Sequence, residues 1–175
     1  KIDLLASGSS YIEDIPDARL GAVVASGRYR ASADPADLAG FDIAVISVPT
    51  PLREGLPDLS YIESSAAVLG GHLKPGACVI LESTTYPGTP AELVAPLLEQ
   101  ASGFQLGYSP ERIDPGNATY TLETTPKVVS GIDAESLARV QGFYDALVDR
   151  TVPVRSPKEA ELTKLLENTF RHVNI

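Results

Sequence analysis

Three apolar runs of the chain end in turns whose residues could do chemistry. Val48 is followed by Pro-Thr-Pro, Leu81 by a hydroxyl-rich turn at residues 82–89, and Tyr108 by a segment with an adjacent glutamate and arginine. Pro and Gly hold such turns in fixed conformations at low entropic cost. Because ligands of open parallel sheets lie beyond the carboxyl ends of the strands, these turns are the first candidates for a binding site.

The last segment of the chain carries a second group of polar side chains. Lys164, Asn168 and Arg171 follow one another at spacings of four and three residues, so a helix presents them on one face. Glu161 lies one helical turn before Lys164 and is expected to orient it. A face with Lys and Asn is also typical of a helix side that only meets water, and periodicity alone favours that alternative.

Each turn also has a purely structural explanation. The two prolines after Val48 can simply end a strand. Thr89, followed by Pro90, is a suitable start for a helix. Glu111 beside Arg112 can be a solvated ion pair that contributes little to stability. Because the three turns share one predicted edge of a sheet, this explanation is weaker for the set than for any single turn.

Strand-like and helix-like segments alternate along the chain. Residues 43–48 and 78–81 are apolar nearly throughout, which is typical of strands buried on both faces of a parallel sheet. Strands are predicted at residues 29–32, 43–48, 78–81, 104–108, 127–130 and 151–154. Helices are predicted from Asp58 or Ser60 to about Leu73, from Thr89, from Asp133, and from Pro157 to Ile175. This alternation predicts an α/β fold, a Rossmann-like doubly wound and mostly parallel sheet.

The spacing of apolar residues predicts which helix faces are buried. The residues expected to face the core are Ile62, Ala66, Leu69 and Leu73 in the first helix, Leu93, Leu97 and Leu98 in the second, Leu137, Val140, Phe143, Tyr144 and Leu147 in the third, and Leu162, Leu165, Leu166, Thr169 and Val173 in the last. Cys78 lies within an apolar run and is expected to be a small core residue.

Composition and charge limit the classes of partner. The formal net charge is −9, which argues against a nucleic acid or an anionic membrane as partner, because both need a basic surface. No apolar run approaches the roughly 20 residues of a membrane span, and the first residues lack a signal-peptide layout. A single cysteine fits a reducing cytoplasm. His72 and His172 lie far apart without a cluster at ligand spacing, so no metal site is predicted.

Several segments taken together resemble a known family. The most specific is Leu-Glu-Ser-Thr-Thr-Tyr-Pro-Gly-Thr at residues 81–89, and the second is the block at 108–117. The other matching segments are residues 10–14, 48–52, 57–61, 125–129 and 164–170. In this order they are similar to the UDP-glucose/GDP-mannose dehydrogenase family, most closely to the branch that acts on UDP-N-acetylglucosamine or UDP-N-acetylmannosamine.

The resemblance implies an activity and a cofactor. Enzymes of this family oxidise the C6 alcohol of a nucleotide sugar, such as a UDP-sugar, to the uronic acid through an aldehyde, in two NAD-dependent steps. The residues that match NAD contacts are Val48, Pro49, Thr50, Ser83 and Thr84. The resemblance further implies a homo-oligomer, with a dimer expected, and a cytoplasmic enzyme of polysaccharide biosynthesis.

The resemblance also implies catalytic and substrate-binding roles. Glu111 matches a glutamate that helps to activate water, and Thr84 a threonine near the nicotinamide and a catalytic water. Lys164 matches a lysine that steadies a developing oxyanion, and Asn168 matches its hydrogen-bonding partner. An ammonium and an amide there would stabilise charge that appears only in the transition state, while a carboxylate can act as general base. The expected substrate contacts are Glu111, Arg112, Ile113, Lys164 and Asn168.

The chain departs from the family pattern in three places. The family's first strand, its Gly-x-Gly-x-x-Gly turn and its second strand are not found, and Gly8 and Gly21 do not form that turn. The family's nucleophilic cysteine follows the lysine helix at a distance, and Cys78 cannot replace it because it maps to a strand interior. A further family glutamate corresponds to Pro115, and Asp114 is not assigned its role.

These departures predict an incomplete enzyme. We expect residues 1–156 to form a partial NAD-binding Rossmann domain without its first βαβ unit, and residues 157–175 to begin the helix that leads to a missing substrate domain. Alone, the chain is expected to reduce no NAD with any UDP-sugar. The alternative is a non-catalytic remnant that binds a nucleotide or a partner subunit. An upstream glycine turn and a downstream cysteine in the gene would favour the enzyme, whereas a native start at Lys1 would favour the remnant.

Overall fold

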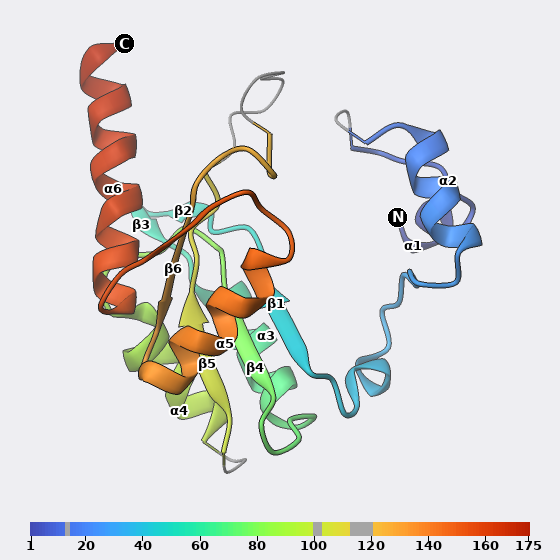
Figure 1. The fold of residues 1–175 in the computed structure, drawn as a ribbon, viewed down its shortest axis with the longest axis horizontal. Coiled ribbons are helices and arrows are strands. Elements are labelled where there is room, and N and C mark those ends of the chain that lie inside the picture. Colours follow the sequence, from blue (N-terminus) through green and yellow to red (C-terminus); the bar gives the residue numbers. More distant parts are fainter. Residues whose placement is uncertain (13–14, 100–102, 113–120) are drawn as a thin grey trace. The chain divides into compact units, whose positions relative to one another are not determined.

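The computed structural model describes residues 1–12, 15–99, 103–112 and 121–175. Within them the chain forms two compact units, Lys1–Leu38 and Ala39–Ile175 (Figure 1). The larger unit is a sheet with helices on both faces, which confirms the predicted α/β class. The predicted substrate contact Ile113, together with Asp114 and Pro115, lies outside the described residues.

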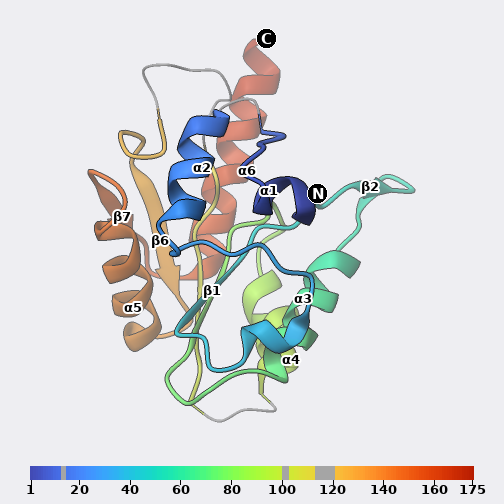
Figure 2. The same ribbon diagram turned by 90° about the vertical axis from the view of Figure 1, so that its right-hand side faces the viewer.

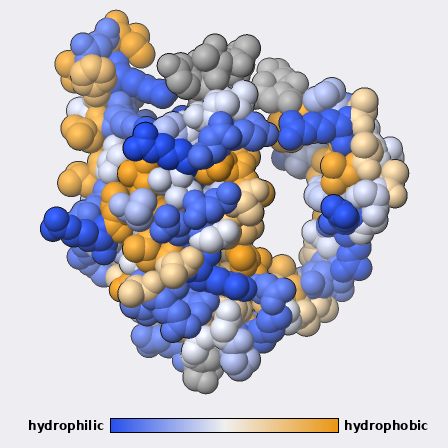
Figure 3. Space-filling model, viewed as in Figure 1, coloured by the Kyte–Doolittle hydropathy of each residue, from blue (hydrophilic) through white to orange (hydrophobic). Residues whose placement is uncertain are grey.

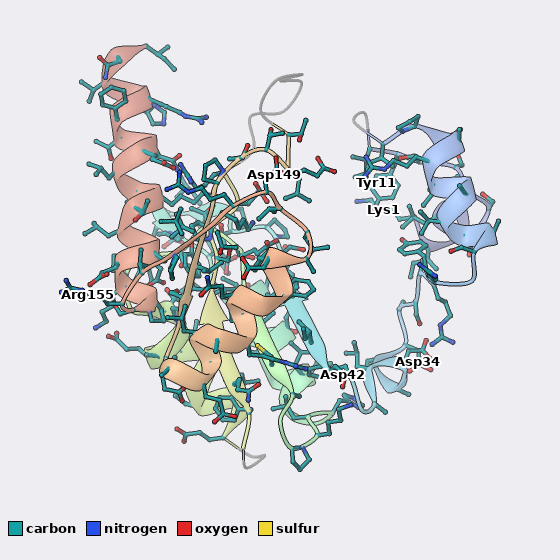
Figure 4. All side chains as sticks on the ribbon, in the orientation of Figure 1. Lys1, Tyr11, Asp34, Asp42, Asp149 and Arg155 are labelled. Carbon is teal, nitrogen blue, oxygen red and sulfur yellow. The ribbon has the colours of Figure 1, made fainter. Side chains whose placement is uncertain are left out.

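The smaller unit contains two short helices and a 3-10 turn. These are α1 (Ile2–Ala6), α2 (Asp17–Ala25) and η1 (Pro35–Leu38). Lys1 Nζ lies 5.3 Å from the ring centroid of Tyr11 (Figure 4). The strand predicted at residues 29–32 is wrong, because the segment between α2 and η1 is irregular. A lone tyrosine between arginines gives such a segment little apolar surface with which to join a sheet.

The larger unit is built on a five-stranded sheet with the order β1-β4-β5-β6-β7 (Figure 1). Its strands are β1 (Ile43–Ile46), β4 (Cys78–Leu81), β5 (Gln105–Tyr108), β6 (Lys127–Gly131) and β7 (Thr151–Pro153). The strands β1, β4 and β5 run parallel, whereas β6 runs antiparallel to β5. Ile46, Leu81 and Tyr108 lie level in the register, so the turns after them meet at one edge. Because β6 is reversed, its first residue, Lys127, also reaches that edge.

Helices cover both faces of this sheet (Figure 2). One face carries α3 (Ser60–Gly70), the π-helical turn η2 (Pro90–Val94) and α4 (Ala95–Leu98), and the other carries α5 (Ala134–Asp145). The predicted cap of α5 is confirmed, because a side-chain oxygen of Asp133 accepts from Ser136 N at 2.7 Å. The sheet is therefore doubly wound, as the alternation of segments predicts.

A small hairpin that the sequence analysis does not predict precedes α3. It pairs β2 (Leu52–Arg53) with β3 (Leu56–Pro57). The two residues between the strands, Glu54 and Gly55, both have positive φ angles of 55° and 83°. This is the backbone that a type I′ turn requires, and glycine supplies one of its two positions without strain.

The core lies between the sheet and its helices. It includes Cys78, Ile80, Val129, Val140 and Tyr144, so the prediction of Cys78 as a core residue is confirmed. The predicted α3 face is correct for Ile62, Ala66 and Leu69, which are buried, but not for Leu73, which follows the end of the helix and is only partly buried. The prediction for Leu147 is wrong, since it follows the end of α5 and is 46% exposed.

The last helix, α6 (Pro157–Asn174), begins where predicted, and the Ser156 hydroxyl accepts from Glu159 N at 3.3 Å. The prediction of its buried stripe is wrong. The residues that are buried are Pro157, Ala160 and Glu161, all in the first turns. Leu162, Leu166 and Val173 are 57%, 68% and 78% exposed, and apolar surface is visible along α6 in Figure 3. The reason is that α6 meets β5 and β6 at its start and then extends past the sheet (Figure 1).

Among the described residues, no helix combines the length and the apolar character needed to cross a membrane.

Candidate functional site

A cavity of about 320 Å³ lies at the sheet edge where the carboxyl ends of β1, β4 and β5 meet. Its lining residues are Ser47, Val48, Pro49, Thr50, Glu82, Ser83, Thr84, Glu111 and Lys164. They come from the turns after three strands and from α6, which are far apart in the sequence. The cavity thus brings together all five residues predicted to contact NAD and three of the four predicted catalytic residues, Thr84, Glu111 and Lys164. Sequence reasoning did not single out Ser47 or Glu82, although both adjoin predicted positions.

Hydrogen bonds fix the wall that the turns after β1 and β4 form. The Ser83 hydroxyl is buried and donates to Val48 O at 2.7 Å. The main-chain N of Glu82 donates to Ile46 O at 2.9 Å, and Tyr108 donates its hydroxyl to Ser83 O at 3.3 Å. Thr84 is exposed and lines the cavity. Ser83 therefore acts mainly as a tie between two turns, whereas Thr84 presents its side chain to the cavity.

A buried lysine lies beneath the cavity and joins its two carboxylates. Lys127 Nζ donates to Glu82 Oε1 at 2.8 Å and to Glu111 Oε2 at 3.3 Å. Tyr144 donates its hydroxyl to the same Glu82 oxygen at 2.6 Å. Burial, with the neighbouring Glu82 charge, raises the pKa of Tyr144, so it stays a phenol that donates. The sequence signal for Lys127 was a charged residue at the start of an apolar run.

Lys164 reaches the cavity from the second turn of α6. It is half-buried, and its Nζ donates to the main-chain O of Glu111. Burial lowers the pKa of Lys164, and the Lys127 charge lowers it further, while Glu111 and Glu82 act in the opposite direction. An ammonium with a lowered pKa releases a proton more readily and stabilises a nearby negative charge strongly.

The prediction that Glu161 orients Lys164 is wrong. Glu161 is buried and accepts from the Thr85 hydroxyl at 2.9 Å and from Gly88 N at 2.6 Å. The prediction that Thr89 caps the next helix is also wrong, because its backbone is already helical and its hydroxyl donates to Tyr86 O. A carboxylate near the first N–H groups of a helix is favourable for the same reason as a side-chain cap.

A smaller cavity of about 110 Å³ adjoins the first one. Its lining residues are Glu111, Arg112, Lys164, Glu167, Asn168 and Arg171. Asn168 is exposed and lines this smaller cavity rather than the larger one. Glu111 and Lys164 line both cavities, so a ligand that fills the smaller one also reaches the groups of the larger.

Arg112 is held by a partner that sequence spacing did not indicate. Its guanidinium forms a two-pronged ion pair with Glu167 of α6, with 2.7 Å between Nε and Oε2. It also donates from Nη1 to Pro126 O at 2.7 Å. The Glu111 carboxylate contacts the main chain of Arg112 rather than its guanidinium, because Arg112 N donates to Glu111 Oε1 at 2.6 Å. The alternative of a simple solvated pair between these neighbours is therefore wrong.

Within the described ranges, no group of three His, Cys, Asp or Glu side chains is arranged to hold a metal ion.

Comparison with known proteins supports one assignment. Residues 1–148 match the model of the UDP-glucose/GDP-mannose dehydrogenase family, NAD binding domain. The chain is 42% identical over 147 residues to Protein CapL of Staphylococcus aureus and 39% identical over 147 residues to the UDP-N-acetyl-D-glucosamine 6-dehydrogenase of Pseudomonas aeruginosa. In both cases the match covers 79% of this chain and 35% of the relative.

A solved structure supports the fold independently. The UDP-D-ManNAc dehydrogenase of Pyrococcus horikoshii superposes with a TM-score of 0.91 at 34% identity, covering 99% of this chain and 43% of that one. The chain thus spans less than half the length of these relatives. The resemblance noted from the sequence is confirmed, and the family's domain description names NAD as its cofactor. The chain belongs to the UDP-glucose/GDP-mannose dehydrogenase family.

Proposed function

We propose that the chain supplies the cofactor side of a nucleotide-sugar 6-dehydrogenase. The complete protein would oxidise the C6 alcohol of a UDP-sugar to the uronic acid through an aldehyde, with NAD as oxidant. One observation carries the proposal: Thr84, Glu111 and Lys164, from three distant segments, line one cavity of about 320 Å³. A hydroxyl, a carboxylate and an ammonium around one space are the groups that oxidation and hydration of a carbonyl require.

The wall of the larger cavity suits the nicotinamide end of NAD. Residues 48–50 and Ser83 offer main-chain groups on turns that are tied together, and Thr84 adds a hydroxyl. Uncharged polar groups on a rigid wall are what an uncharged carboxamide and a ribose need for orientation. When bound, NAD accepts the hydride from the sugar carbon. Residues 48–50, Ser83 and Thr84 would hold its nicotinamide end.

Lys164 is the group proposed to stabilise the oxygen of the reacting carbon. Negative charge grows on that oxygen as the alcohol is oxidised, and an ammonium aimed at it lowers the barrier. The pKa of Lys164 is lowered mainly by burial, which makes the ammonium a better proton donor toward an alkoxide-like oxygen. Asn168 follows one turn later on α6 and is proposed to add an amide hydrogen bond from the smaller cavity.

Glu111 is the proposed general base for the second half of the reaction. Water must enter before the acid can be released, and a carboxylate within reach can take its proton. The side chain of Glu111 is 40% exposed and is oriented by Lys127 on one side. Thr84, on the opposite turn, is proposed to hold this water near the nicotinamide.

The smaller cavity is the proposed place for the sugar. It carries Arg112, Asn168 and Arg171, all of which can donate hydrogen bonds to hydroxyl or acyl oxygens. Two of the relatives described above are named for UDP-N-acetylated sugars. We therefore propose a UDP-N-acetylhexosamine as substrate, with Arg112 held in position by Glu167.

The test is an assay of the complete gene product with NAD and a panel of UDP-sugars. We expect NADH to form with a UDP-N-acetylhexosamine, in a ratio of about two per sugar if both steps take place at this site. Lys164→Ala should lower kcat by about 10²–10³, the effect of removing one oxyanion donor. Lys158→Ala is the matched control, because Lys158 lies on the same helix in an exposed ion pair. Absence of NADH with every UDP-sugar, or an equal loss in both variants, would refute the proposal.

Three further expectations belong to the same proposal. The complete protein is expected to be a homo-oligomer, most simply a dimer, which analytical ultracentrifugation tests. A cytoplasmic location is expected, and fractionation of cells tests it. Residues 1–156 and 157–175 are expected to belong to different parts of the complete enzyme, and limited proteolysis tests that boundary.

A further inference from the structure

Glu161 is the most deeply buried carboxylate among the residues that the structure describes. Its relative exposure is 0%, and it lies in the first turns of α6. Each carboxylate oxygen accepts a separate donor, with Thr85 Oγ1 at 2.9 Å and Gly88 N at 2.6 Å. Both donors belong to the turn that follows β4, so one side chain of α6 holds two points of that turn.

The carboxylate is buried without a close cation in the described part of the chain. Lys158, one turn earlier on α6, makes its ion pair with Glu92 at the surface instead. The titratable groups whose charge Glu161 affects are Tyr108 of β5 and Lys158. A buried carboxylate is unfavourable unless hydrogen bonds replace its hydration. The donors of the turn after β4 therefore provide the compensation, and the turn and Glu161 depend on each other.

Glu161 connects the turn after β4 with α6, and both of these elements line the larger cavity. Thr85 follows Thr84, which lines the cavity from the turn after β4. Lys164 follows Glu161 by three residues on α6 and also lines the cavity. A change at Glu161 would therefore alter the position of one wall relative to the other.

We propose that Glu161 is a positioning residue that fixes Thr84 relative to Lys164 across the cavity. It touches neither ligand pocket, so it acts through the turn and through its own helix. The roles of Thr84 and Lys164 toward a ligand rest on the proposed function, whereas the link between the turn after β4 and α6 does not. A misplacement of about 1 Å between reacting groups can lower a rate by about 10²-fold, so a small release of the turn would be measurable.

The first test measures the link itself by amide hydrogen exchange on the complete gene product without ligands. Glu161→Gln keeps the shape but offers one acceptor oxygen for two donors. We expect the protection factor of the peptide that contains Gly88 to fall about tenfold, while that of the peptide covering β4 does not change. Thr85→Val removes the other donor, and the double variant should be less affected than the sum of the two singles. Glu92→Gln, which removes an exposed link between η2 and α6, is the control and should match the wild type.

A second arm needs no variant. Burial raises the pKa of Glu161, so mild acid protonates it and removes one acceptor. The protection factor of Gly88 in the wild type should then fall toward the value of Glu161→Gln, and in that variant it should not respond to pH. If Glu161→Gln does not fold, the fall of Gly88 protection in the wild type, set against an unchanged β4 peptide, decides the matter.

The functional arm separates positioning from a purely structural role. In Glu161→Gln, kcat per folded molecule should fall by about tenfold or more at saturating NAD, while the KM for the UDP-sugar stays within about twofold. A purely structural role would lower the melting temperature and leave kcat per folded molecule intact. Unchanged Gly88 protection, unchanged kcat, or an equal effect of Glu92→Gln would each overturn the inference. If the wild type proves to be no dehydrogenase, the proposed function fails, and the exchange and pH arms still decide whether Glu161 holds the turn.

Discussion

Lys127→Met should destabilise the fold because it removes the cation between two carboxylates. The Lys127 side chain is 4% exposed, and its Nζ lies 2.8 Å from Glu82 and 3.3 Å from Glu111. Methionine is nearly as long and stays apolar, so the substitution leaves no appreciable cavity. Its effect should therefore report the lost charge rather than lost packing.

The magnitude follows from the exposure of the two partners. Removing one partner of a buried ion pair typically costs about 3–5 kcal/mol, because the other charge stays buried. Glu82 is 17% exposed and keeps the Tyr144 hydroxyl, and Glu111 is 40% exposed and can regain water. We therefore expect the lower end of that range, about 3 kcal/mol of the free energy of unfolding.

Urea unfolding at neutral pH measures the effect. Lys158→Met is the control, because it removes an equal charge from an exposed ion pair and should leave the midpoint close to that of the wild type. Adding Glu82→Gln to Lys127→Met should restore part of the loss, with a coupling of about 1–3 kcal/mol. If Lys127→Met unfolds at the wild-type midpoint, or no more easily than Lys158→Met, the account of a buried, charge-compensated cluster is refuted.

Two further predictions concern packing and titration. Gly131→Ala should destabilise the chain by about 3 kcal/mol in thermal or urea unfolding, because the new Cβ would lie 2.7 Å from Leu137 Cα and closer still to Leu137 N. The control is Gly142→Ala on the adjoining helix, whose new Cβ meets nothing within 4 Å and which should be neutral or slightly stabilising. Equal effects of the two substitutions would contradict this prediction. Burial raises the pKa of Cys78 from 9.0 to about 11, so the native state keeps a proton that the unfolded chain loses. The stability that this group contributes is therefore complete below pH 9.0 and is lost as the pH rises toward 11. Cys78→Ala should weaken that alkaline loss of stability when unfolding is measured at a series of pH values.

Local patterns in the sequence were sufficient for most strands and for the start of α6. The run at residues 78–81 is β4 without change, because four apolar residues between turns have few other stable arrangements. The cap at Asp133 could also be predicted from the sequence, since a cap acts within three residues. The exposure of the apolar face of α6 could not be predicted in this way. The spacing of apolar residues shows that a helix has an apolar side, but not which element packs against that side.

The site was predictable in its residue types but not in its connections. Thr84, Glu111 and Lys164 could be nominated because each stands just after a strand or on one helix face. The links from Glu161 to Thr85 and from Arg112 to Glu167 join residues 76 and 55 positions apart, and no local pattern carries such information. Thr89 illustrates the consequence: its type and its following proline favour a cap, yet its hydroxyl donates to Tyr86 O and makes no cap bond.

The reversed direction of β6 has a chemical consequence at the cavity. A parallel β6 would place its first residue at the opposite edge of the sheet, whereas the antiparallel strand brings Lys127 beneath Glu82 and Glu111. Lys127 and Glu82 are both largely buried and satisfy each other with Tyr144, so their charges are directed inward. Glu82, Glu111 and Lys164 all line the cavity, and the Glu111 side chain is the more exposed of the two carboxylates, at 40% against 17% for Glu82.

The four charged groups differ in how they are paired. Lys127 Nζ lies closer to Glu82, at 2.8 Å, than to Glu111, at 3.3 Å, so Glu82 is its nearer partner. Lys164 in turn bonds to the main chain of Glu111 rather than to its carboxylate, which leaves two of its three ammonium protons for other acceptors.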